Sequence, residues 1–434
     1  MTTIQVKVEQ GMLRGEVKNE CAIFRGVPYA EPPIGDKRFQ SPQPKKGWDD
    51  VRDATSFSNQ CPQREISDGF YGKEFYNDLN YPLPMNDEDC LYLNIWAPEK
   101  KSPTGYPVAI YYHGGSFDHG FSSEMEFDGM GYASRDTILV TVNYRIGLFG
   151  FLALEELARE DMNHSSGNYG ILDQIQALKW VRKNIAAFGG NPDNITLIGQ
   201  SVGAVSVQTL ISSPLTRGMV KGAIMQSGGG LNNNFYRSIS RERAYEIGKK
   251  VQELLGVTYA RELRNLPKEK FVDILPKLYE EVGAHPFGPV VDDFVLEESL
   301  DEYVLNNHIH NIPCIIGSNK NDLYTEDLED KTKGPLYQGC KDFALERNKH
   351  NGQPVYMYYF TRQLPGDDAG AFHSAELWYM FGTYERSWRP MDGRRDYILS
   401  RTMLDEWTTF MKYQKPMTGW QPYDDKNEFV RRFI

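Results

Sequence analysis

The feature that most constrains the fold is a short stretch at residues 194–203, with the sequence NITLIGQSVG. An apolar run of strand length, Ile195 to Ile198, leads into the G-x-S-x-G motif at 199–203, and an apolar segment of helical length follows at 204–211. Between a strand and a buried helix, this motif forms a sharp turn that holds a serine hydroxyl out at the carboxyl edge of a sheet. The glycines let neighbouring backbone pass close to the turn. The stretch therefore predicts that Ser201 is a nucleophile.

The rest of the chain predicts a sheet flanked by helices. Near-continuous apolar runs, typical of strands covered on both faces, lie at 108–112, 138–142, 222–226, 313–316 and 355–360. Apolar residues recur at helical spacing over 170–188, and 240–310 looks mainly helical. Alternation over 4–30, with turns expected at Gly11 and Gly15, and a run at 91–96 predict antiparallel strands. We therefore expect one α/β domain over residues 1–434, with a mostly parallel doubly wound sheet, an N-terminal antiparallel portion, and chemistry at the carboxyl ends of the strands.

Charge and hydropathy exclude several classes of partner. The net charge is −11 and there is no basic run, which argues against nucleic acid and anionic membranes. No apolar run approaches the roughly 18 residues that span a bilayer. The first residues, MTTIQVK, lack the apolar core of a signal peptide. These features predict a cytoplasmic protein whose partner is a small molecule, and they leave its oligomeric state open.

Neither the cysteines nor the histidines indicate a metal. The chain has 5 cysteines, at 21, 61, 90, 314 and 340, without a C-x-x-C motif or other metal-ligand spacing. His308 and His310 stand two apart in a predicted loop, where such a pair is usually incidental. No metal and no cofactor are predicted.

A serine nucleophile needs a base and an orienting carboxylate, which in this type of sheet follow it in the order serine, acid, histidine. His373 lies in a glycine-containing loop, GAFHSAE, after the run at 355–360, where a late histidine is expected. The acid should follow an intervening strand. Asp322 lies shortly after 313–316, and Glu326 and Asp327 remain competitors on spacing alone.

The reaction also needs donors for a developing oxyanion. Val202 supplies one backbone N–H by its position after the nucleophile. A second is expected from a glycine-rich loop after an early strand. The sequence HGGS at 113–116, directly after the run at 108–112, is the best candidate.

These residues and others resemble the type-B carboxylesterases, a family that includes cholinesterases and bacterial para-nitrobenzyl esterases. The resemblance extends over most of the chain and rests on GVPYAEPP at 26–33, RF at 38–39, EDCLYLN at 88–94, YHGGSF at 112–117, NYR at 143–145, GFL at 150–152, GNYGILDQ at 167–174, FGGNP at 188–192, QSG at 226–228 and PVVD at 289–292. It implies an α/β-hydrolase fold, with Ser201 as nucleophile, His373 as base and Asp322 as acid. It further implies oxyanion donors at Gly115, Ser116 and Val202, and a hydrogen bond from Ser227 to the acid.

The chain departs from the family pattern at several places. Asp322 stands where glutamate is usual, and Ser116 stands where a third glycine is usual. Gln200 replaces a glutamate, which removes a negative charge and argues against cationic choline esters as substrates. The chain is shorter than typical members, mainly between Asp322 and 355–360, which implies a reduced helical cap and a more open, shallower acyl pocket. Cys61 and Cys90 align with the family's first disulfide, but without a signal peptide we expect them to be reduced.

The leading hypothesis is a serine hydrolase that cleaves short-chain or aryl carboxylic esters through an acyl-enzyme. One alternative is a non-catalytic, cholinesterase-like binding module. Another is that the same machinery acts on amides, thioesters or acyl transfer. A third is a feruloyl or acetyl esterase acting on plant-polymer esters, suggested by the aromatic residues after His373, namely Trp378, Tyr379, Phe381, Tyr384 and Trp388.

Overall fold

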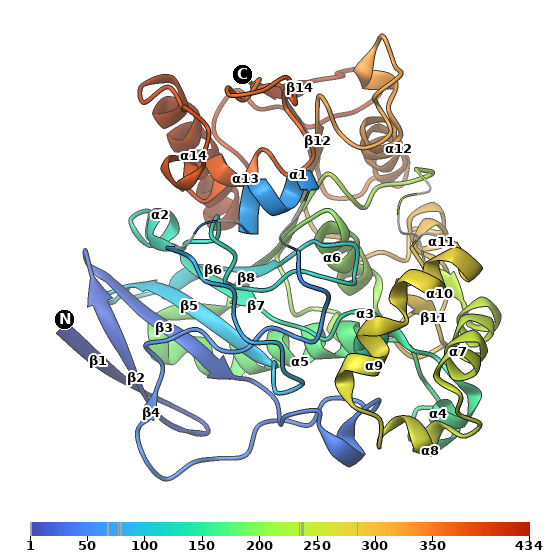
Figure 1. The fold of residues 1–434 in the computed structure, drawn as a ribbon. Helices are drawn as coiled ribbons and strands as arrows, with labels where there is room; N and C mark the ends of the chain where they lie inside the picture. The colour runs from blue at the N-terminus through green and yellow to red at the C-terminus, as the bar shows by residue number, and fades with distance from the viewer. Residues whose placement is uncertain are drawn as a thin grey trace.

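A large mixed sheet runs through the molecule with helices on both of its faces (Figure 1). The structure is a computed structural model that describes residues 2–66, 69–76, 78, 80–233, 235, 238–283 and 285–434. Within these ranges the sheet has 12 strands, in the order β1-β2-β3-β5-β7-β6-β8-β9-β12-β13-β14, with β4 paired to β2. The strands of this sheet are β1 Thr2–Val8, β2 Gly11–Lys18, β3 Cys21–Pro28, β4 Arg52–Asp53, β5 Tyr92–Pro98, β6 Tyr106–Tyr112, β7 Ile138–Val142, β8 Gly190–Gln200, β9 Gly222–Gln226, β12 Cys314–Asn319, β13 Val355–Phe360 and β14 Val430–Phe433.

The sheet changes character along its width. From β1 to β7 each neighbour is antiparallel, and from β7 through β6 to β14 each neighbour is parallel. A mostly parallel sheet with an antiparallel N-terminal portion is therefore confirmed. The carboxyl ends of β6, β8, β9, β12 and β13 meet at one edge, as parallel strands require.

Helices connect these strands and cover them. The main ones are α2 Met130–Ala133, α3 Gly147–Phe151, α4 Glu155–Glu160, α5 Tyr169–Asn184, α6 Val202–Ser212, α12 Pro335–Lys349, α13 Leu377–Met380 and α14 Arg395–Tyr413. Residues 240–310, predicted to be mainly helical, form α7 Arg241–Leu255, α8 Ala260–Leu263, α9 Lys268–Asp273, α10 Leu275–Val282 and α11 Leu300–Leu305, with the small pair β10 Ile239–Ser240 and β11 Val290–Val291 between and beside them. A short turn of helix, α1 Gly69–Tyr71, lies next to α13 (Figure 1).

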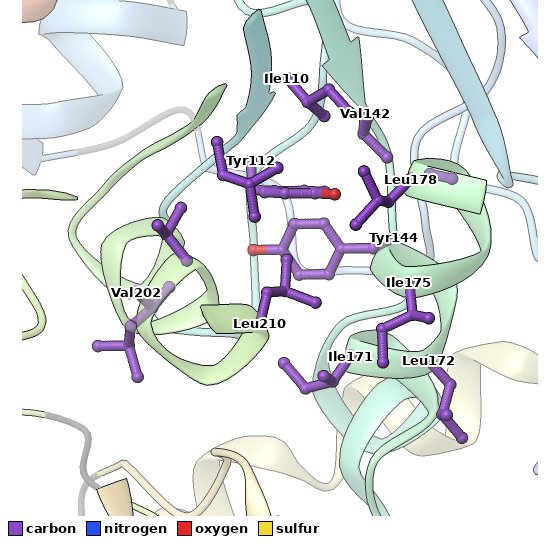
Figure 2. Packing of buried hydrophobic residues seen from close by; sticks show 14 of the residues in the cluster. Ile110, Tyr112, Val142, Tyr144, Ile171, Leu172, Ile175, Leu178, Val202 and Leu210 are labelled. Atoms are coloured by element: carbon purple, nitrogen blue, oxygen red, sulfur yellow. The ribbon is translucent and has the colours of Figure 1, made fainter. Parts of the chain in front are cut away.

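Alternate residues of each central strand pack into two separate cores. Ile110 and Tyr112 of β6 face the larger core with α5 and α6, whereas Ala109 and Tyr111 face a second core with α13 and α14. Figure 2 shows the first of these, where Tyr112 and Tyr144 lie between α5 and α6. Burial on both faces explains why the central strands read as continuous apolar runs.

One predicted turn is wrong. Gly15 lies inside β2, opposite Ile4 of β1, and not at a turn. A Cβ at Gly15 would come within 2.5 Å of the Ile23 carbonyl oxygen and 2.7 Å of the Phe24 ring. The glycine therefore permits close approach of β3 to β2. In a sequence, a glycine needed for such packing cannot be told from a glycine at a turn.

Several motifs that carry the resemblance form buried ion pairs. Arg145 binds Asp173 through Nε at 2.7 Å and a second guanidinium nitrogen at 2.8 Å, and both side chains are buried. Arg38 pairs with Glu88 in the same bidentate way. Such pairs are planar and directional, so they fix the loops that carry them.

The expectation that Cys61 and Cys90 are reduced is also wrong, because the structure joins them in a disulfide. Their Cα atoms lie 5.1 Å apart, which is within the range a disulfide requires. The expectation rested on the first residues of the chain, which carry no information about the distance between these two cysteines. Disulfides are typical of oxidising compartments, so the cytoplasmic location stays a prediction without support from this bond. No helix in the described ranges has the length and apolar character needed to cross a bilayer.

Candidate active site

Ser201 occupies a strained turn between β8 and α6. Its backbone angles are φ 59° and ψ −129°, and it caps the amino end of α6. The space around this turn is filled by backbone. A Cβ would come within 2.1 Å of a carbonyl oxygen at Gly199, Gly203 and Gly228, the last of these being the oxygen of Ser201 itself. Only glycine fits at these three positions, which is why the motif needs Gly199 and Gly203 and why Gly228 follows Ser227.

The loops after β12 and β13 bring the predicted acid and base together. Asn321 and Phe372 form a parallel bridge between these loops, and Asn321 N–H donates to the Ala371 carbonyl at 3.0 Å. Asp322 and His373 follow directly on the two sides of this bridge. Asp322 Oδ1 lies 2.5 Å from His373 Nδ1, and both side chains are buried.

Asp322 is held as a charged carboxylate by several donors. Oδ2 accepts from Ser227 Oγ at 2.7 Å and from the Asn319 N–H at 2.9 Å, and Oδ1 also accepts from the Leu323 N–H at 3.0 Å. Burial alone would raise the pKa of Asp322, but the charge and hydrogen bond of His373, with the donors from Asn319 and Ser227, lower it below its ordinary value.

The competing acids are not paired with the imidazole, although Glu326 lines the same cavity. Glu326 and Asp327 are both exposed, and neither contacts the imidazole among the hydrogen bonds of the described residues. The predicted hydrogen bond from Ser227 to the acid is present. Ser227 itself has a positive φ of 47°, directly after β9, which places its hydroxyl at the same sheet edge as Asp322.

The loop after β6 lies beside Ser201. Gly114, Gly115 and Ser116 line the same cavity as Ser201, and Gly115 and Ser116 have φ values of 93° and 55°. Ser116 therefore adopts a left-handed conformation that glycine adopts more easily, which accounts for glycine being usual at this place. Val202 is the first residue of α6, so its N–H has no partner within the helix.

Ser201 and His373 line one cavity, but the imidazole Nε2 is contacted by another group. Gln200 Nε2 lies 3.3 Å from His373 Nε2. The hydrogen bonds of the described residues include none between Ser201 Oγ and the imidazole. Hydrogen bonds of this kind are often long in a ligand-free enzyme and tighten when substrate binds. The sequence drew attention to Gln200 because it replaces a charged glutamate. It did not predict the contact of Gln200 with the imidazole.

The cavity at Ser201 has a volume of about 380 Å³. Tyr111 of β6 also lines it. Its other walls come from segments that the sequence did not single out, with lining residues that include Tyr71, Phe75, Tyr76, Glu124, Glu126, Phe127, Phe235 and Tyr324. The aromatic residues after His373 play a different part. Trp378, Tyr379, Phe381 and Tyr384 are buried in the second core, and only Leu377 of that segment lines the cavity. The basis for predicting a hydroxycinnamoyl site from them is therefore lost.

The segment 69–76 is anchored to the second core through Glu74. This buried carboxylate accepts hydrogen bonds from the Trp378 and Trp388 indole nitrogens at 2.9 and 2.8 Å. It also pairs with Arg389 Nε at 2.9 Å. Next to it, the Tyr71 hydroxyl donates to the His373 carbonyl oxygen at 3.3 Å. The segment is therefore positioned on the imidazole side of the cavity.

A second buried carboxyl, Glu376, lies behind Asp322. Asn319 Nδ2 donates to Glu376 Oε2 at 2.5 Å and to the Phe372 carbonyl at 2.7 Å, while its backbone N–H donates to Asp322. Burial, reinforced by the charge of Asp322, raises the pKa of Glu376 to about 7, even though the bond from Asn319 opposes the shift. Nothing in the sequence indicates this group beyond its place three residues after His373.

The two histidines considered as metal ligands point to different partners. His308 is exposed and its Nδ1 lies 2.7 Å from Glu298, whereas His310 Nε2 lies 3.1 Å from the Ser213 carbonyl oxygen. Among the residues that the structure describes, no group of three histidine, cysteine, aspartate or glutamate side chains is placed to hold a metal ion.

Comparison with known proteins places this chain in a family. The family model described as "Carboxylesterase family" matches residues 2–333 and 333–433. The break at residue 333 falls inside the interval where the sequence predicts that family helices are missing. The para-nitrobenzyl esterase of Bacillus subtilis (strain 168) is 32% identical over 480 aligned positions, which cover 98% of this chain and 94% of the relative.

Solved structures show the same fold. A PNB esterase structure superposes with a TM-score of 0.87 at 30% identity, covering 99% of this chain and 95% of the other. A carboxylesterase of Geobacillus stearothermophilus superposes with a TM-score of 0.82 at 29% identity, covering 99% and 96%. The predicted α/β-hydrolase fold is thereby confirmed.

Proposed function

Because the chain belongs to the carboxylesterase family and is a serine hydrolase of carboxylic esters, we propose that Ser201, His373 and Asp322 are its catalytic triad. The observation that carries this assignment is the contact of 2.5 Å between Asp322 Oδ1 and His373 Nδ1, at the cavity that Ser201 also lines. Asp322 holds the proton of the imidazole on Nδ1, which leaves Nε2 free to act as a base.

In this mechanism His373 Nε2 accepts the proton of Ser201 as the serine oxygen attacks the ester carbonyl. The tetrahedral intermediate collapses when the imidazolium returns that proton to the departing alcohol, and an acyl-enzyme remains. Water then attacks the acyl-enzyme with the same imidazole as base, and the carboxylic acid is released. The low pKa of Asp322 keeps its carboxylate charged while the imidazolium forms.

The carbonyl oxygen gains negative charge in both steps. The backbone N–H groups of Gly115, Ser116 and Val202 are the proposed donors, since the first two line the cavity beside Ser201 and the third begins α6. The amino end of α6 also favours negative charge there. Ser227 positions Asp322 through its hydrogen bond of 2.7 Å.

The substrates that this cavity supports best are short-chain or aryl esters. A volume of about 380 Å³ with aromatic walls accepts a small acyl group and a single ring. With Gln200 in place of an acid beside the imidazole, choline esters are not favoured.

The assignment is tested with Ser201→Ala and para-nitrophenyl acetate or butyrate. Removing the nucleophile should lower kcat by about 10⁵- to 10⁶-fold, because the triad acts as a unit. Ser212→Ala is the matched control, since Ser212 is buried in the same helix, lies outside the cavity and has no hydrogen-bond partner for its hydroxyl in the described part of the chain. Activity of Ser201→Ala near that of this control would refute the nucleophile.

A further inference from the structure

The cavity holds a second pair of carboxylate and imidazole that the reaction does not use. His119 lines the cavity, and 30% of its side chain is exposed. Its Nδ1 lies 2.5 Å from Asp118 Oδ1, while Asp118 Oδ2 accepts a hydrogen bond from the Tyr279 hydroxyl of α10. Asp322 is arranged in the same way, since it accepts from an imidazole Nδ1 and from the Ser227 hydroxyl. The carboxylate and the hydroxyl therefore hold the second imidazole in one orientation.

One nitrogen of this imidazole is open to the cavity. An ionised carboxylate only accepts hydrogen bonds, so the hydrogen between His119 and Asp118 is carried by the ring Nδ1. Among the described residues, Nε2 of His119 has no hydrogen-bond partner, and it is not one of their buried unpaired atoms. A molecule in the cavity can therefore reach Nε2 and pair with it.

Gln200 connects the imidazole of His373 with the loop after β6. Its amide nitrogen lies 3.3 Å from His373 Nε2. On the other side of this amide, a Cβ at Gly114 would come within 3.1 Å of the Gln200 amide oxygen and 3.0 Å of Ser201 Cβ. Gly114 therefore lies next to the nucleophile on the side that the imidazole occupies.

His119 packs against the next residue of this loop. A Cβ at Gly115 would come within 2.9 Å of His119 Cδ2, the ring carbon that is bonded to Nε2. The backbone N–H of His119 also donates to the Gly115 carbonyl at 2.9 Å, so the ring stays beside this glycine. Because the imidazolium of His373 protonates the departing alcohol, the ring of His119 borders the alcohol part of the ester.

A hydroxyl group is the ligand that fits this nitrogen best. A neutral ring accepts a hydrogen bond at Nε2 and a protonated ring donates one, and a hydroxyl can take either part. A carboxylate pairs only with the protonated ring and would lie near the like charge of Asp118. An ammonium group pairs only with the neutral ring. Binding of a hydroxyl is therefore independent of the charge on His119.

We propose that His119 binds a hydroxyl group on the alcohol part of the ester, so that the enzyme prefers monoesters of diols and other small polyols. The inference rests on the proposed triad, because the alcohol part is located by reference to Ser201 and His373. A cavity of about 380 Å³ has room for such an alcohol next to a short acyl chain. Asp118 and Tyr279 act through His119 as positioning residues.

The test compares kcat/KM for three butyrates, namely 2-hydroxyethyl butyrate, propyl butyrate and butyrylcholine. The first two differ only in the hydroxyl or methyl group at the end of the alcohol. The hydroxyethyl ester should exceed the propyl ester by about fivefold, the value of one hydrogen bond. Butyrylcholine carries a positive charge and no hydroxyl, and it should be the poorest of the three.

Variants then locate the effect. His119→Phe keeps a ring but removes both nitrogens, so the ratio of hydroxyethyl to propyl ester should fall to about one. Tyr279→Phe removes only the hydroxyl that orients Asp118 and should lower the ratio by about twofold. A general loss of structure would lower kcat/KM for both esters together and leave the ratio unchanged.

His308→Phe is the matched control. This exposed imidazole also lies against a carboxylate through Nδ1, at 2.7 Å from Glu298, but it is outside the lining of the cavity. The variant should keep the wild-type ratio and the wild-type turnover of para-nitrophenyl butyrate.

The outcomes separate the hydroxyl site from the catalytic assignment. A wild-type ratio of one or less, or a ratio that His119→Phe leaves unchanged, would overturn the site, while turnover of para-nitrophenyl butyrate would leave the triad intact. A preference for butyrylcholine over the hydroxyethyl ester would overturn it in favour of a cation site. Absence of turnover on all three butyrates and on para-nitrophenyl butyrate would overturn both proposals.

Discussion

Two buried acidic regions border the same cavity, and they are built in opposite ways. Asp322 accepts hydrogen bonds from His373, Ser227, and the backbone at 319 and 323, and its pKa is lowered in spite of complete burial. Glu126, which lines that cavity, lies against the carboxyl group of Glu124, and burial together with the charge of Glu124 raises its pKa well above the ordinary value. Burial is common to both, so the number of donors decides which carboxyl keeps its charge.

The difference teaches how carboxyl groups buried beside one cavity come to differ in charge. The carboxylate of Asp322, which is proposed to stabilise an imidazolium, accepts hydrogen bonds from donors in three separate segments of the chain. Glu126 has no comparable set of donors within the described residues, so its charged form is disfavoured. Glu376 is intermediate, since it shares Asn319 with Asp322 but holds a pKa of about 7.

The largest effect on activity should come from removing the charge of Asp322, the carboxylate that accepts several hydrogen bonds. Asp322→Asn keeps the shape but favours the wrong imidazole tautomer, so kcat for para-nitrophenyl acetate should fall by about 10⁴-fold. Asp327→Asn, which changes an exposed carboxylate five residues away, should keep wild-type kcat. A small loss for Asp322→Asn would mean that the donors around position 322 serve the fold and not the reaction.

Glu376→Gln should change how stability depends on pH. The pKa of Glu376 is raised from 4.5 to about 7 by folding, so the folded protein binds this proton more tightly than the unfolded chain. The contribution of Glu376 to the free energy of unfolding is full below pH 4.5. It is lost as the pH rises to about 7, by roughly 3 kcal/mol in total.

The measurement is the free energy of urea unfolding at pH 5 and pH 8. Wild type should lose about 2–3 kcal/mol more than Glu376→Gln over this interval, because glutamine has no proton to release. Equal losses in the two proteins would show that Glu376 titrates near its ordinary value, and the contrast with Asp322 would then disappear.

The smallest effect should come from removing one donor of several. Ser227→Ala deletes the hydrogen bond to Asp322 Oδ2, which should lower kcat/KM by about tenfold, the value of a hydrogen bond to a charged group. The pKa of Asp322 is lowered in the folded protein, so the stability it contributes is present above pH 3.8 and is lost as the pH falls through the folded value. Losing a donor raises that value, and acid unfolding should begin at higher pH than in wild type. An unchanged acid-unfolding midpoint would contradict a role for Ser227 in holding the charge.

The sequence predicted the parts of the site that repeat a local pattern. Ser201 follows from its motif between strand and helix, and His373 and Asp322 follow from loops after buried strands. Between Asp322 and its competitors, spacing could not decide, because the choice depends on the bridge from Asn321 to Phe372 across 51 positions of chain.

The cavity walls could not be predicted in the same way. Tyr71 and Tyr76 lie in a short helical segment and Glu126 lies in a loop, and none of these segments has an apolar periodicity; the position of the helical segment depends on contacts such as that of Glu74 with Arg389. Aromatic residues after His373 looked like a binding surface but form core, since packing against α14 leaves no sign in composition. The role of Gly15 was missed because it depends on the distance between two strands. The disulfide was missed for another reason: the resemblance paired Cys61 with Cys90, but the start of the chain was taken to mean that they are reduced.

The crowding around Ser201 has a consequence for laboratory evolution of this enzyme. At Gly199, Gly203 and Gly228, any side chain would place its Cβ only 2.1 Å from a backbone carbonyl oxygen, well inside contact distance. Libraries that randomise these codons would yield mostly inactive clones. Diversity placed instead at Tyr71, Phe75 or Tyr111 would alter selectivity while leaving the turn that presents the nucleophile untouched.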